Sequence, residues 1–467
     1  MSRIYREGGA MDRLEVARRY VSDHAEQMIA DLQRLVRQPS VSATGEGVAE
    51  CARLLVEIMA GLGIEAEVVE TDGQPLVLGW ARAERADAPT LLVYCHYDVQ
   101  PPDPLDAWEY PPFEARRVGD RIVGRGTTDA KGNLMALLQA VGALRATGGL
   151  PVHLTFLFDG EEESGSPSLP AAVERLRARL QADAAMAFDG GFDAGDIPRI
   201  SLGTSGLLFV KLRARGAAHD LHSARARLVP NPAWRLVWAL ATMKAPDGRV
   251  LIEGFYDRVR PPTEVERALL ERAGWDDEAQ RRALGVKRFI DDLQGIDALE
   301  RLLYSPTCNI AGFSAGYAGE GSKTVLPATA TVNLDFRLVC DQDPEEIARL
   351  LRQHLDRHGF ADVEMRVLGG SIEPSRTPPD APIVDVTVEA ARQVYGREPR
   401  LLPTGDASGR EATWLANRLG IPGVQTGIGP PAWRGHAPNE FITVRHYLDG
   451  ICFAAAIWLL AAERLRA

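Results

Sequence analysis

Short apolar runs that alternate with amphipathic helical segments dominate the first part of this sequence. The runs TLLVYCHYDV and PVHLTFLF have the length and composition of buried strands. Between them, KGNLMALLQAVGALRATGG carries apolar residues at helical spacing and ends at two glycines. LPAAVERLRARL and DAAMAFD continue the alternation as a helix and a strand. This order predicts an α/β sheet with helices on its faces.

The pattern changes near Ser201. GLLFVKLRARG and ATATVNLDFRLV alternate apolar and polar residues, as half-exposed strands do, and a helix is predicted at DPEEIARLLRQHLDRHG. A chain of 467 residues is too long for one core, and the proline-rich IEPSRTPPDAP is typical of a linker. We therefore predict a first domain of residues 1–203 and 377–467, with an α+β domain of residues 204–376 inserted into it.

Composition argues against several kinds of partner and compartment. The formal net charge is -11 and no run is dense in Lys and Arg, so we expect no nucleic-acid partner. No uninterrupted apolar run reaches the roughly 18 residues of a membrane span, and the first residues lack the apolar core of a signal peptide. The five cysteines are scattered, which disfavours a disulfide framework and a cysteine zinc site. We expect a cytoplasmic protein.

An acidic stretch, FDGEEESGS, directly follows the second apolar run. It contains four carboxylates: Asp159, Glu161, Glu162 and Glu163. A run of charges is most often a solvated surface, so this stretch by itself predicts no site. Whether it forms a site depends on which residues follow the other predicted strands.

Other polar residues stand at comparable positions. His96 and Asp98 end one strand, Asp189 ends another, His436 lies in a Gly- and Pro-rich loop after a third, and Asp129 opens a helix. Each has an ordinary explanation alone, such as a loop histidine or a helix N-cap. Together they predict a site at the carboxyl edge of the sheet.

This set of side chains indicates metal ions. Imidazole and carboxylate groups bind zinc, manganese or cobalt, and a set without cysteine suits all three. The ligands outnumber the three that a catalytic zinc ion usually takes from the protein, so two ions fit better than one. One carboxylate left uncoordinated could take a proton from a metal-bound water and later give it to a leaving group.

Six motifs taken in order carry a family resemblance: HYDVQP, GRGTTDAKG, EEESGS, FDGG, DLHS and GHAPNE. They resemble the dizinc metallopeptidases and amidohydrolases that include carnosine dipeptidases, acetylornithine deacetylase, succinyl-diaminopimelate desuccinylase, aminoacylase and carboxypeptidase G. The stretch HYDVQPP is most similar to the dipeptidase branch. The resemblance implies a mixed-sheet α/β catalytic domain and an inserted α+β domain that acts as a lid and forms a homodimer.

The resemblance also implies a ligand set. It pairs His96 with Asp189 at one ion and Glu163 with His436 at the other, and it makes Asp129 the bridge between the ions. The peptide bond after the bridging aspartate is expected in cis. The two divalent ions are expected to be zinc, with manganese or cobalt as alternatives.

The acidic stretch divides into separate roles under the same resemblance. Glu162 matches the general base, which directly precedes a glutamate ligand, and Asp98 matches the carboxylate that orients His96. Glu161 matches a position without a catalytic role, and we expect it to be solvated. Asp159 receives no role.

The inserted domain and one loop carry the expected substrate contacts. His222 in DLHS matches a lid histidine that reaches the partner subunit's site and stabilises an oxyanion, and Arg337 in NLDFRLVC matches an arginine that binds the substrate carboxylate.

Cys95 departs from the family, which usually has glycine there. The loop PTGDASGRE replaces a Gly-Gly-Ser loop and brings Ser408 forward as a substrate contact.

The sequence thus predicts a metal-dependent hydrolase that cleaves an amide bond next to a free carboxylate in dipeptides or short peptides. A metal-bridging water attacks, and Glu162 is the general base. The alternative is an N-acyl or N-carbamoyl amino-acid amidohydrolase with the same machinery. A non-catalytic relative that only binds peptides would not need both the ligand set and Glu162.

Overall fold

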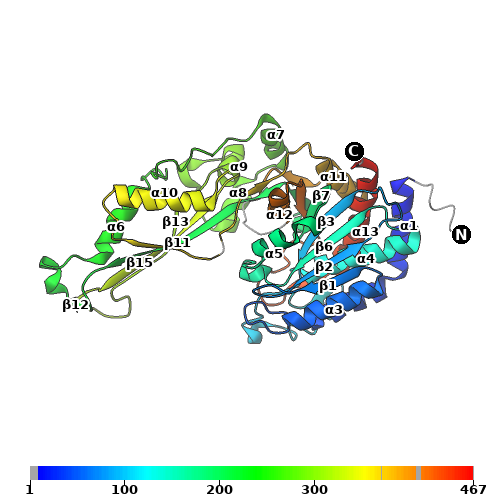
Figure 1. The fold of residues 1–467 in the computed structure, drawn as a ribbon, viewed down its shortest axis with the longest axis horizontal. Coiled ribbons are helices and arrows are strands. Elements are labelled where there is room, and N and C mark those ends of the chain that lie inside the picture. The colour runs from blue at the N-terminus through cyan, green and yellow to red at the C-terminus, as the bar shows by residue number, and fades with distance from the viewer. Residues whose placement is uncertain (1–8, 370, 406–411, 466–467) are drawn as a thin grey trace. The chain divides into compact units, whose positions relative to one another are not determined.

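A computed structural model describes residues 9–369, 371–405 and 412–465. It divides into two compact units (Figure 1). The first contains the described residues of Met1–Gly203, Arg376–Thr404 and Arg410–Ala467, and the second contains those of Thr204–Ser375 and Gly405–Gly409.

The first unit is built around a mixed sheet, which has nine strands in the described part of the chain. Its strand order is β1-β2-β6-β3-β7-β19-β9-β18, and β8 pairs with β9. β3 runs parallel to both β6 and β7, and β19 runs parallel to β7. The strands are β1 (Glu65–Val69), β2 (Leu76–Ala81), β3 (Thr90–His96), β6 (His153–Asp159), β7 (Ala184–Phe188), β8 (Phe192–Asp193), β9 (Ile197–Ser201), β18 (Arg400–Leu402) and β19 (Gly423–Thr426).

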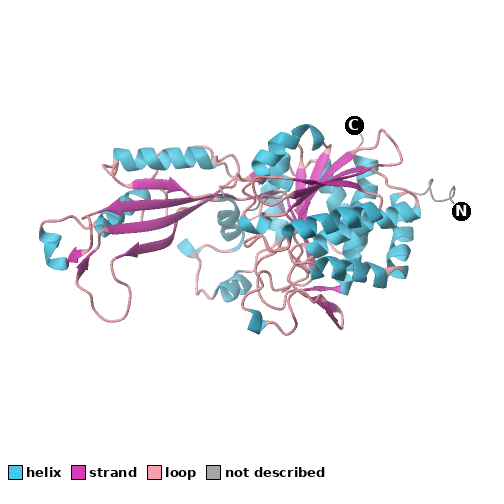
Figure 2. Cartoon of the chain, turned by 60° about the horizontal axis from the view of Figure 1, so that its bottom comes forward, coloured by secondary structure: helices cyan, strands magenta, loops and turns pink. Residues whose placement is uncertain are grey.

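Helices cover both faces of this sheet (Figure 2). The central strands β3, β6 and β7 are buried almost throughout, as parallel strands covered on two sides are. Side chains of β3 such as Leu92 and Tyr94 share a core cluster with Leu169 and Leu415 from the helices of one face. The helices of the first unit are α1 (Ala10–Asp23), α2 (Ala25–Arg37), α3 (Val48–Gly61), α4 (Lys131–Thr147), α5 (Leu169–Leu176), α11 (Pro382–Tyr395), α12 (Ala412–Leu419) and α13 (Val444–Arg464).

Among the described helices, α13 alone is long and apolar enough to cross a membrane by length and composition. However, 83% of its apolar window is buried inside the protein. It packs against α1, α4 and α11. Its apolar composition is therefore that of a core helix.

The second unit has a four-stranded antiparallel sheet in the order β13-β15-β11-β16. Along β11 and β15 buried and more exposed residues alternate, so one face of the sheet is buried against α6 and α10. The elements are α6 (Pro232–Met243), α7 (Glu264–Ala273), α8 (Asp277–Leu284), α9 (Gly295–Tyr304), α10 (Pro344–Arg357), β11 (Gly206–Arg215), β13 (Asn309–Ala315), β15 (Thr329–Leu338) and β16 (Glu364–Val367). Short strands complete the two units: β4 (Arg116–Val118), β5 (Arg121–Val123), β10 (Gly203–Thr204), β12 (Leu221–His222), β14 (Val325–Leu326), β17 (Ser375–Arg376) and β20 (Phe441–Thr443). The predicted fold class, a mixed-sheet α/β unit with an inserted α+β unit, is confirmed.

Candidate metal centre

The candidate site lies at the carboxyl ends of three neighbouring strands. His96 is the last residue of β3, and Asp189 directly follows β7. After β6 the chain forms a 3-10 turn that begins with Glu162 and Glu163. Because these three strands are parallel and adjacent, their polar ends meet at one edge of the sheet, as ligand sites of α/β proteins do.

A glycine allows two of the site loops to pass close together. A Cβ atom added to Gly191 would lie 2.1 Å from the carbonyl oxygen of Gly429. Gly191 lies two residues after Asp189, and Gly429 belongs to the loop that leads to His436. The FDGG motif therefore serves backbone packing between two segments that each carry a polar site residue.

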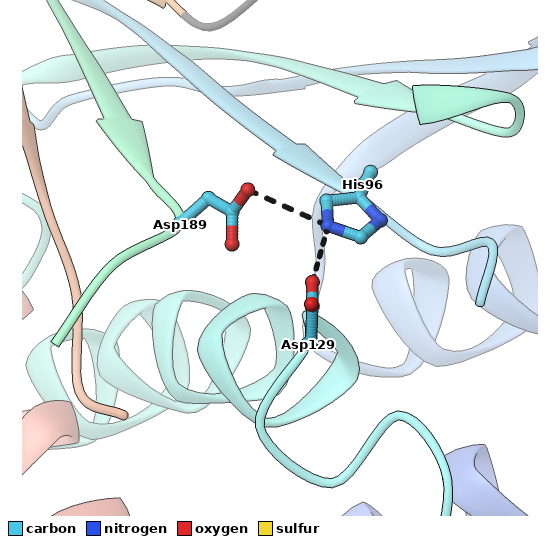
Figure 3. Close-up of side chains that lie close together, drawn as sticks. All are labelled: His96, Asp129 and Asp189. Atoms are coloured by element: carbon cyan, nitrogen blue, oxygen red, sulfur yellow. Dashed lines mark hydrogen bonds and ion pairs between the residues drawn. The ribbon is translucent and has the colours of Figure 1, made fainter. Parts of the chain in front are cut away.

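The first group of polar side chains consists of His96, Asp129 and Asp189. Figure 3 shows both carboxylates directed at the same imidazole nitrogen. The Nε2 atom of His96 lies 3.0 Å from Oδ1 of Asp129 and 3.5 Å from Oδ2 of Asp189. The imidazole is fully buried. One nitrogen and two carboxylate oxygens thus converge on one point.

The second group consists of Asp129, Glu163 and His436. The Nε2 atom of His436 lies 3.2 Å from Oδ2 of Asp129 and 3.2 Å from Oε2 of Glu163. Asp129 therefore presents a different oxygen to each group, as a carboxylate that bridges two cations does. In each group, one ligand atom from every residue lies within 4.8 Å of the others. The Asp129–Ala130 peptide bond is cis, as predicted.

The electrostatics of these groups fit divalent cations. Burial lowers the pKa of His96, but Asp189 and the other nearby carboxylates outweigh it and hold that pKa well above its usual value. Hydrogen bonds to Asp129 and Glu163 raise the pKa of His436 to about 10. Burial also raises the pKa of Glu162 well above its usual range. The raised pKa values show that this group of carboxylates favours positive charge nearby, as a site for divalent cations would.

Asp98 is buried and supports the site from behind. Its Oδ1 lies 3.3 Å from Nδ1 of His96. The same carboxylate accepts hydrogen bonds from the backbone N–H groups of Glu162, at 3.1 Å, and Glu163, at 3.0 Å. Asp98 thus contacts the imidazole as an orienting carboxylate would, and it also holds the turn that carries the two glutamates.

Glu161 corrects a prediction. It is only 4% exposed, and its two oxygens accept hydrogen bonds from the backbone N–H groups of Gln74 and Ser168, at 3.1 and 2.5 Å. The expectation that it is solvated is wrong. Two other segments of the chain fold over this carboxylate, and nothing in the local sequence indicates that they do.

Asp159, which the sequence left without a role, is buried beneath the same turn. It accepts hydrogen bonds from the hydroxyl groups of Ser166, at 2.6 Å, and Tyr94, at 3.2 Å, and from the backbone N–H of Glu161, at 3.1 Å. Burial raises the pKa of Asp159 to about 6. Two of the four acidic residues therefore brace the turn, and the other two remain for the site.

Sequence reasoning missed two further contacts of the site residues. Gln100 donates from Nε2 to Oε2 of Glu163 at 2.9 Å. Glu440 accepts hydrogen bonds from the loop that carries Asp129. Both residues belong to the motifs HYDVQP and GHAPNE, but only the folded chain shows which partners they have.

The remaining predicted residues lie in other parts of the chain. His222 and Arg337 belong to the second unit, where they lie at the end of β12 and in β15, and both are exposed. The Nδ1 atom of His222 accepts a hydrogen bond from the backbone N–H of Ala224 at 3.2 Å. Ser408 lies outside the described residues.

Comparison with known proteins agrees with this architecture. The sequence model of the peptidase family M20/M25/M40 matches residues 92–460. The Cys-Gly metallodipeptidase dug1 of Schizosaccharomyces pombe is 28% identical over 91% of this chain and 94% of its own length. The mouse Beta-Ala-His dipeptidase is 26% identical over 96% of this chain and 95% of its own.

Solved structures show the same fold along nearly the whole chain. The M20 family metallo-carboxypeptidase Sso-CP2 from Sulfolobus solfataricus has a TM-score of 0.86 and 39% identity, covering 93% of this chain and 99% of that one. The dipeptidase Dug1p from Saccharomyces cerevisiae has a TM-score of 0.79 and 24% identity, covering 96% and 98%. The predicted family is confirmed: this chain is an enzyme that belongs to the peptidase family M20/M25/M40.

Proposed function

We propose that this protein is a metal-dependent dipeptidase that hydrolyses the peptide bond next to a free carboxylate. The observation that carries the proposal is the position of Asp129, whose two oxygens face two separate groups of histidine and carboxylate side chains. The dipeptidase names of the curated relatives support the substrate class.

Each group would hold one divalent ion. His96 and Asp189 hold the first, Glu163 and His436 hold the second, and Asp129 shares its carboxylate between them. Zinc suits this set of nitrogen and oxygen ligands, and manganese or cobalt are the alternatives. When bound, the ions would polarise the scissile carbonyl and make a water molecule nucleophilic near neutral pH.

Glu162 moves the proton. It stands beside ligand Glu163 in the same turn, and Asp98 holds both backbone N–H groups. Its carboxylate takes a proton from the attacking water and then gives it to the departing amine, so that the amine leaves neutral. Burial among carboxylates raises the pKa of Glu162, which suits a group that must both accept and release a proton.

Three further residues complete the proposed substrate site. Arg337 binds the free carboxylate of the substrate, because a guanidinium can donate two parallel hydrogen bonds to it. His222 stabilises the oxyanion, and it does so in the site of a partner subunit. Ser408 contacts the substrate from the loop that replaces Gly-Gly-Ser.

The proposal includes a homodimer formed through the second unit. On α6 the rings of Trp234 and Trp238 stack at 6.0 Å and are each 56% exposed. On β13, an edge strand of the sheet, Ile310 and Phe313 are also exposed. Large exposed apolar side chains and an open strand edge are typical of subunit interfaces. All five cysteines are free, which supports a reducing, cytoplasmic location.

A second candidate is a carboxypeptidase that removes the last residue of longer peptides. The name of the solved metallo-carboxypeptidase, which is 39% identical to this chain, favours it. Both activities cleave next to a free carboxylate, so they differ only in what the site accepts on the amino side of the bond. The N-acyl amino-acid alternative uses the same chemistry with an acyl group there.

A substrate panel separates these activities. Protein loaded in turn with Zn²⁺, Mn²⁺ or Co²⁺ would be assayed on dipeptides, tripeptides, C-terminally amidated dipeptides and N-acetyl amino acids. The proposal expects fast cleavage of free dipeptides, including Cys-Gly or β-Ala-His, and no cleavage of amidated ones. Faster cleavage of tripeptides supports the carboxypeptidase, and faster release of acetate supports the N-acyl activity. No metal-dependent hydrolysis of any of them contradicts the proposal.

A further inference from the structure

Glu440 is a fully buried carboxylate that accepts four hydrogen bonds from one short segment. Its Oε1 accepts from the backbone N–H groups of Thr128, at 2.9 Å, and Asp129, at 3.1 Å. Its Oε2 accepts from Nη1 of Arg125, at 2.6 Å, and from the backbone N–H of Gly126, at 3.1 Å. The loop that carries Asp129 is thus wrapped around a single side chain.

The loop depends on this side chain for its shape. The residues from Gly126 to Asp129 belong to no helix or strand, so the hydrogen bonds of regular structure do not hold their backbone. A buried N–H group that loses its acceptor costs free energy, which disfavours other conformations of the loop. Glu440 therefore fixes the backbone from which the carboxylate of Asp129 projects.

Glu440 also belongs to the segment that carries His436, four residues earlier. His436 has a left-handed backbone with φ 57° and a side chain that is 59% exposed. The intervening Asn439 anchors the same segment elsewhere, because its side chain accepts from the backbone N–H of Glu109 at 2.8 Å and donates to the carbonyl of Ala107 at 3.0 Å. Glu440 and Asn439 therefore anchor this segment to the rest of the unit, in addition to the two contacts that His436 makes with Asp129 and Glu163.

We propose that Glu440 is a positioning residue that couples the two metal groups. It holds the backbone of Asp129 and, through its own place in the chain, keeps the loop of His436 beside that aspartate. The inference rests on the proposed two-ion function and assigns Glu440 no contact with metal or substrate. Loss of this carboxylate should weaken the binding of both ions and affect the group of His436 most.

A purely structural alternative must be separated from this role. Arg125 and Glu440 form a buried ion pair, and removing one partner of such a pair destabilises a protein because the other charge stays buried. If Glu440 serves only to neutralise Arg125, removing both charges restores stability and metal binding together. If Glu440 positions Asp129, the double change restores only the stability lost through the unpaired charge, and metal binding stays weak.

The test compares Glu440→Gln with the double variant Arg125→Met/Glu440→Gln in the full chain. Metal would be removed with a chelator, and Zn²⁺ titrated by calorimetry well below the unfolding temperature of each variant; Co²⁺ absorption reports the geometry of the ligands. Glu440→Gln should bind Zn²⁺ about 10- to 100-fold more weakly, the range typical when a group that orients metal ligands is lost. The double variant should regain the part of the thermal stability that the unpaired charge of Arg125 had cost, and it should remain a weak binder.

Glu266→Gln is the matched control. This carboxylate is 2% exposed and closes the capping box of α7 in the second unit, so the same substitution there should lower stability and leave Zn²⁺ affinity unchanged. Should Glu440→Gln fail to fold, Glu440→Asp keeps the charge but cannot reach all four donors, and it should also bind Zn²⁺ more weakly.

Two results would overturn the positioning role. One is wild-type Zn²⁺ affinity and Co²⁺ absorption in Glu440→Gln or Glu440→Asp. The other is recovery of metal affinity together with stability in the double variant. If the wild-type protein itself binds fewer than two ions, the proposed function fails, and the coupling of two ions fails with it.

Discussion

The two candidate metal groups share Asp129, but their histidines come from different kinds of structure. His96 ends a central strand, is fully buried and has Asp98 behind it. His436 lies on an irregular loop, and its side chain is 59% exposed. The first group is therefore held by the sheet and the second by loops. We expect the first ion to bind more tightly and the second to exchange more readily.

Backbone conformation also differs between the loop that carries His436 and the strand that carries His96. In the loop of the second group, Ala432, Arg434, His436 and Asn439 all have positive φ. Residues other than glycine rarely adopt this conformation, so surrounding contacts must hold the loop in place. Such contacts are the hydrogen bonds of Glu440 and Asn439. The strand that carries His96 needs no comparable support.

The largest effect is expected at Glu162, which belongs to neither group. Glu162→Gln should lower kcat by about 10²- to 10⁴-fold, the usual contribution of a general acid or base. Both ions should stay bound, because all five proposed ligands remain. Initial rates on a dipeptide and metal content measured on the same sample check this. Loss of an ion together with activity would show that Glu162 is a ligand.

The next prediction tests the contrast directly by removing one histidine at a time. His436→Ala should bind one ion per chain, since the first group is intact. His96→Ala should lose the first ion and also lower the unfolding temperature, because it leaves the carboxylates of Asp129 and Asp189 beside an empty buried space. Metal stoichiometry and thermal unfolding measure both. Greater loss of metal and stability in His436→Ala would reverse the comparison.

A smaller effect is expected from Asp98→Asn. The change weakens the support of His96 and one of the two contacts with the turn of Glu162, so Zn²⁺ affinity or activity should fall about 10- to 100-fold. Asp159→Asn is the control, because Asp159 braces the other side of the turn without a hydrogen bond from Glu162 or Glu163. It should lower stability more than metal affinity. Equal metal affinity and equal activity in wild type and Asp98→Asn would contradict the supporting role.

The last prediction concerns pH and needs no substitution in the first measurement. In the metal-free protein His436 has a raised pKa of about 10, set first by its hydrogen bonds to Asp129 and Glu163. The proton is therefore bound at neutral pH and must leave when metal binds, so Zn²⁺ affinity should rise as pH increases toward that value. Calorimetry in two buffers of different ionisation enthalpy measures the proton release. His436→Ala should release fewer protons when Zn²⁺ binds; release of an equal number would show that the proton does not come from His436.

The strand ends and helix starts of the site were predictable because they depend on local patterns. The pairing of ligands into two groups came from the family resemblance, and it stays a prediction. Sequence reasoning could not place Glu161 or Glu440, which accept hydrogen bonds from residues as far as 87 and 311 positions away, at Gln74 and Asp129. Such contacts depend on which loops meet at the sheet edge. Cys95 shows the same limit, since the contact of its thiol with the carbonyl of Phe188 follows from strand pairing.

The position of β19 between β7 and β9 has a consequence for synthesis. β7 and β9 precede the inserted unit in the chain, and β19 follows it. A growing chain therefore emerges from the ribosome with an incomplete sheet and must produce the whole second unit before the gap can close. Domains form in order of synthesis, so the second unit has the opportunity to fold first, while the residues that complete the first are still being added.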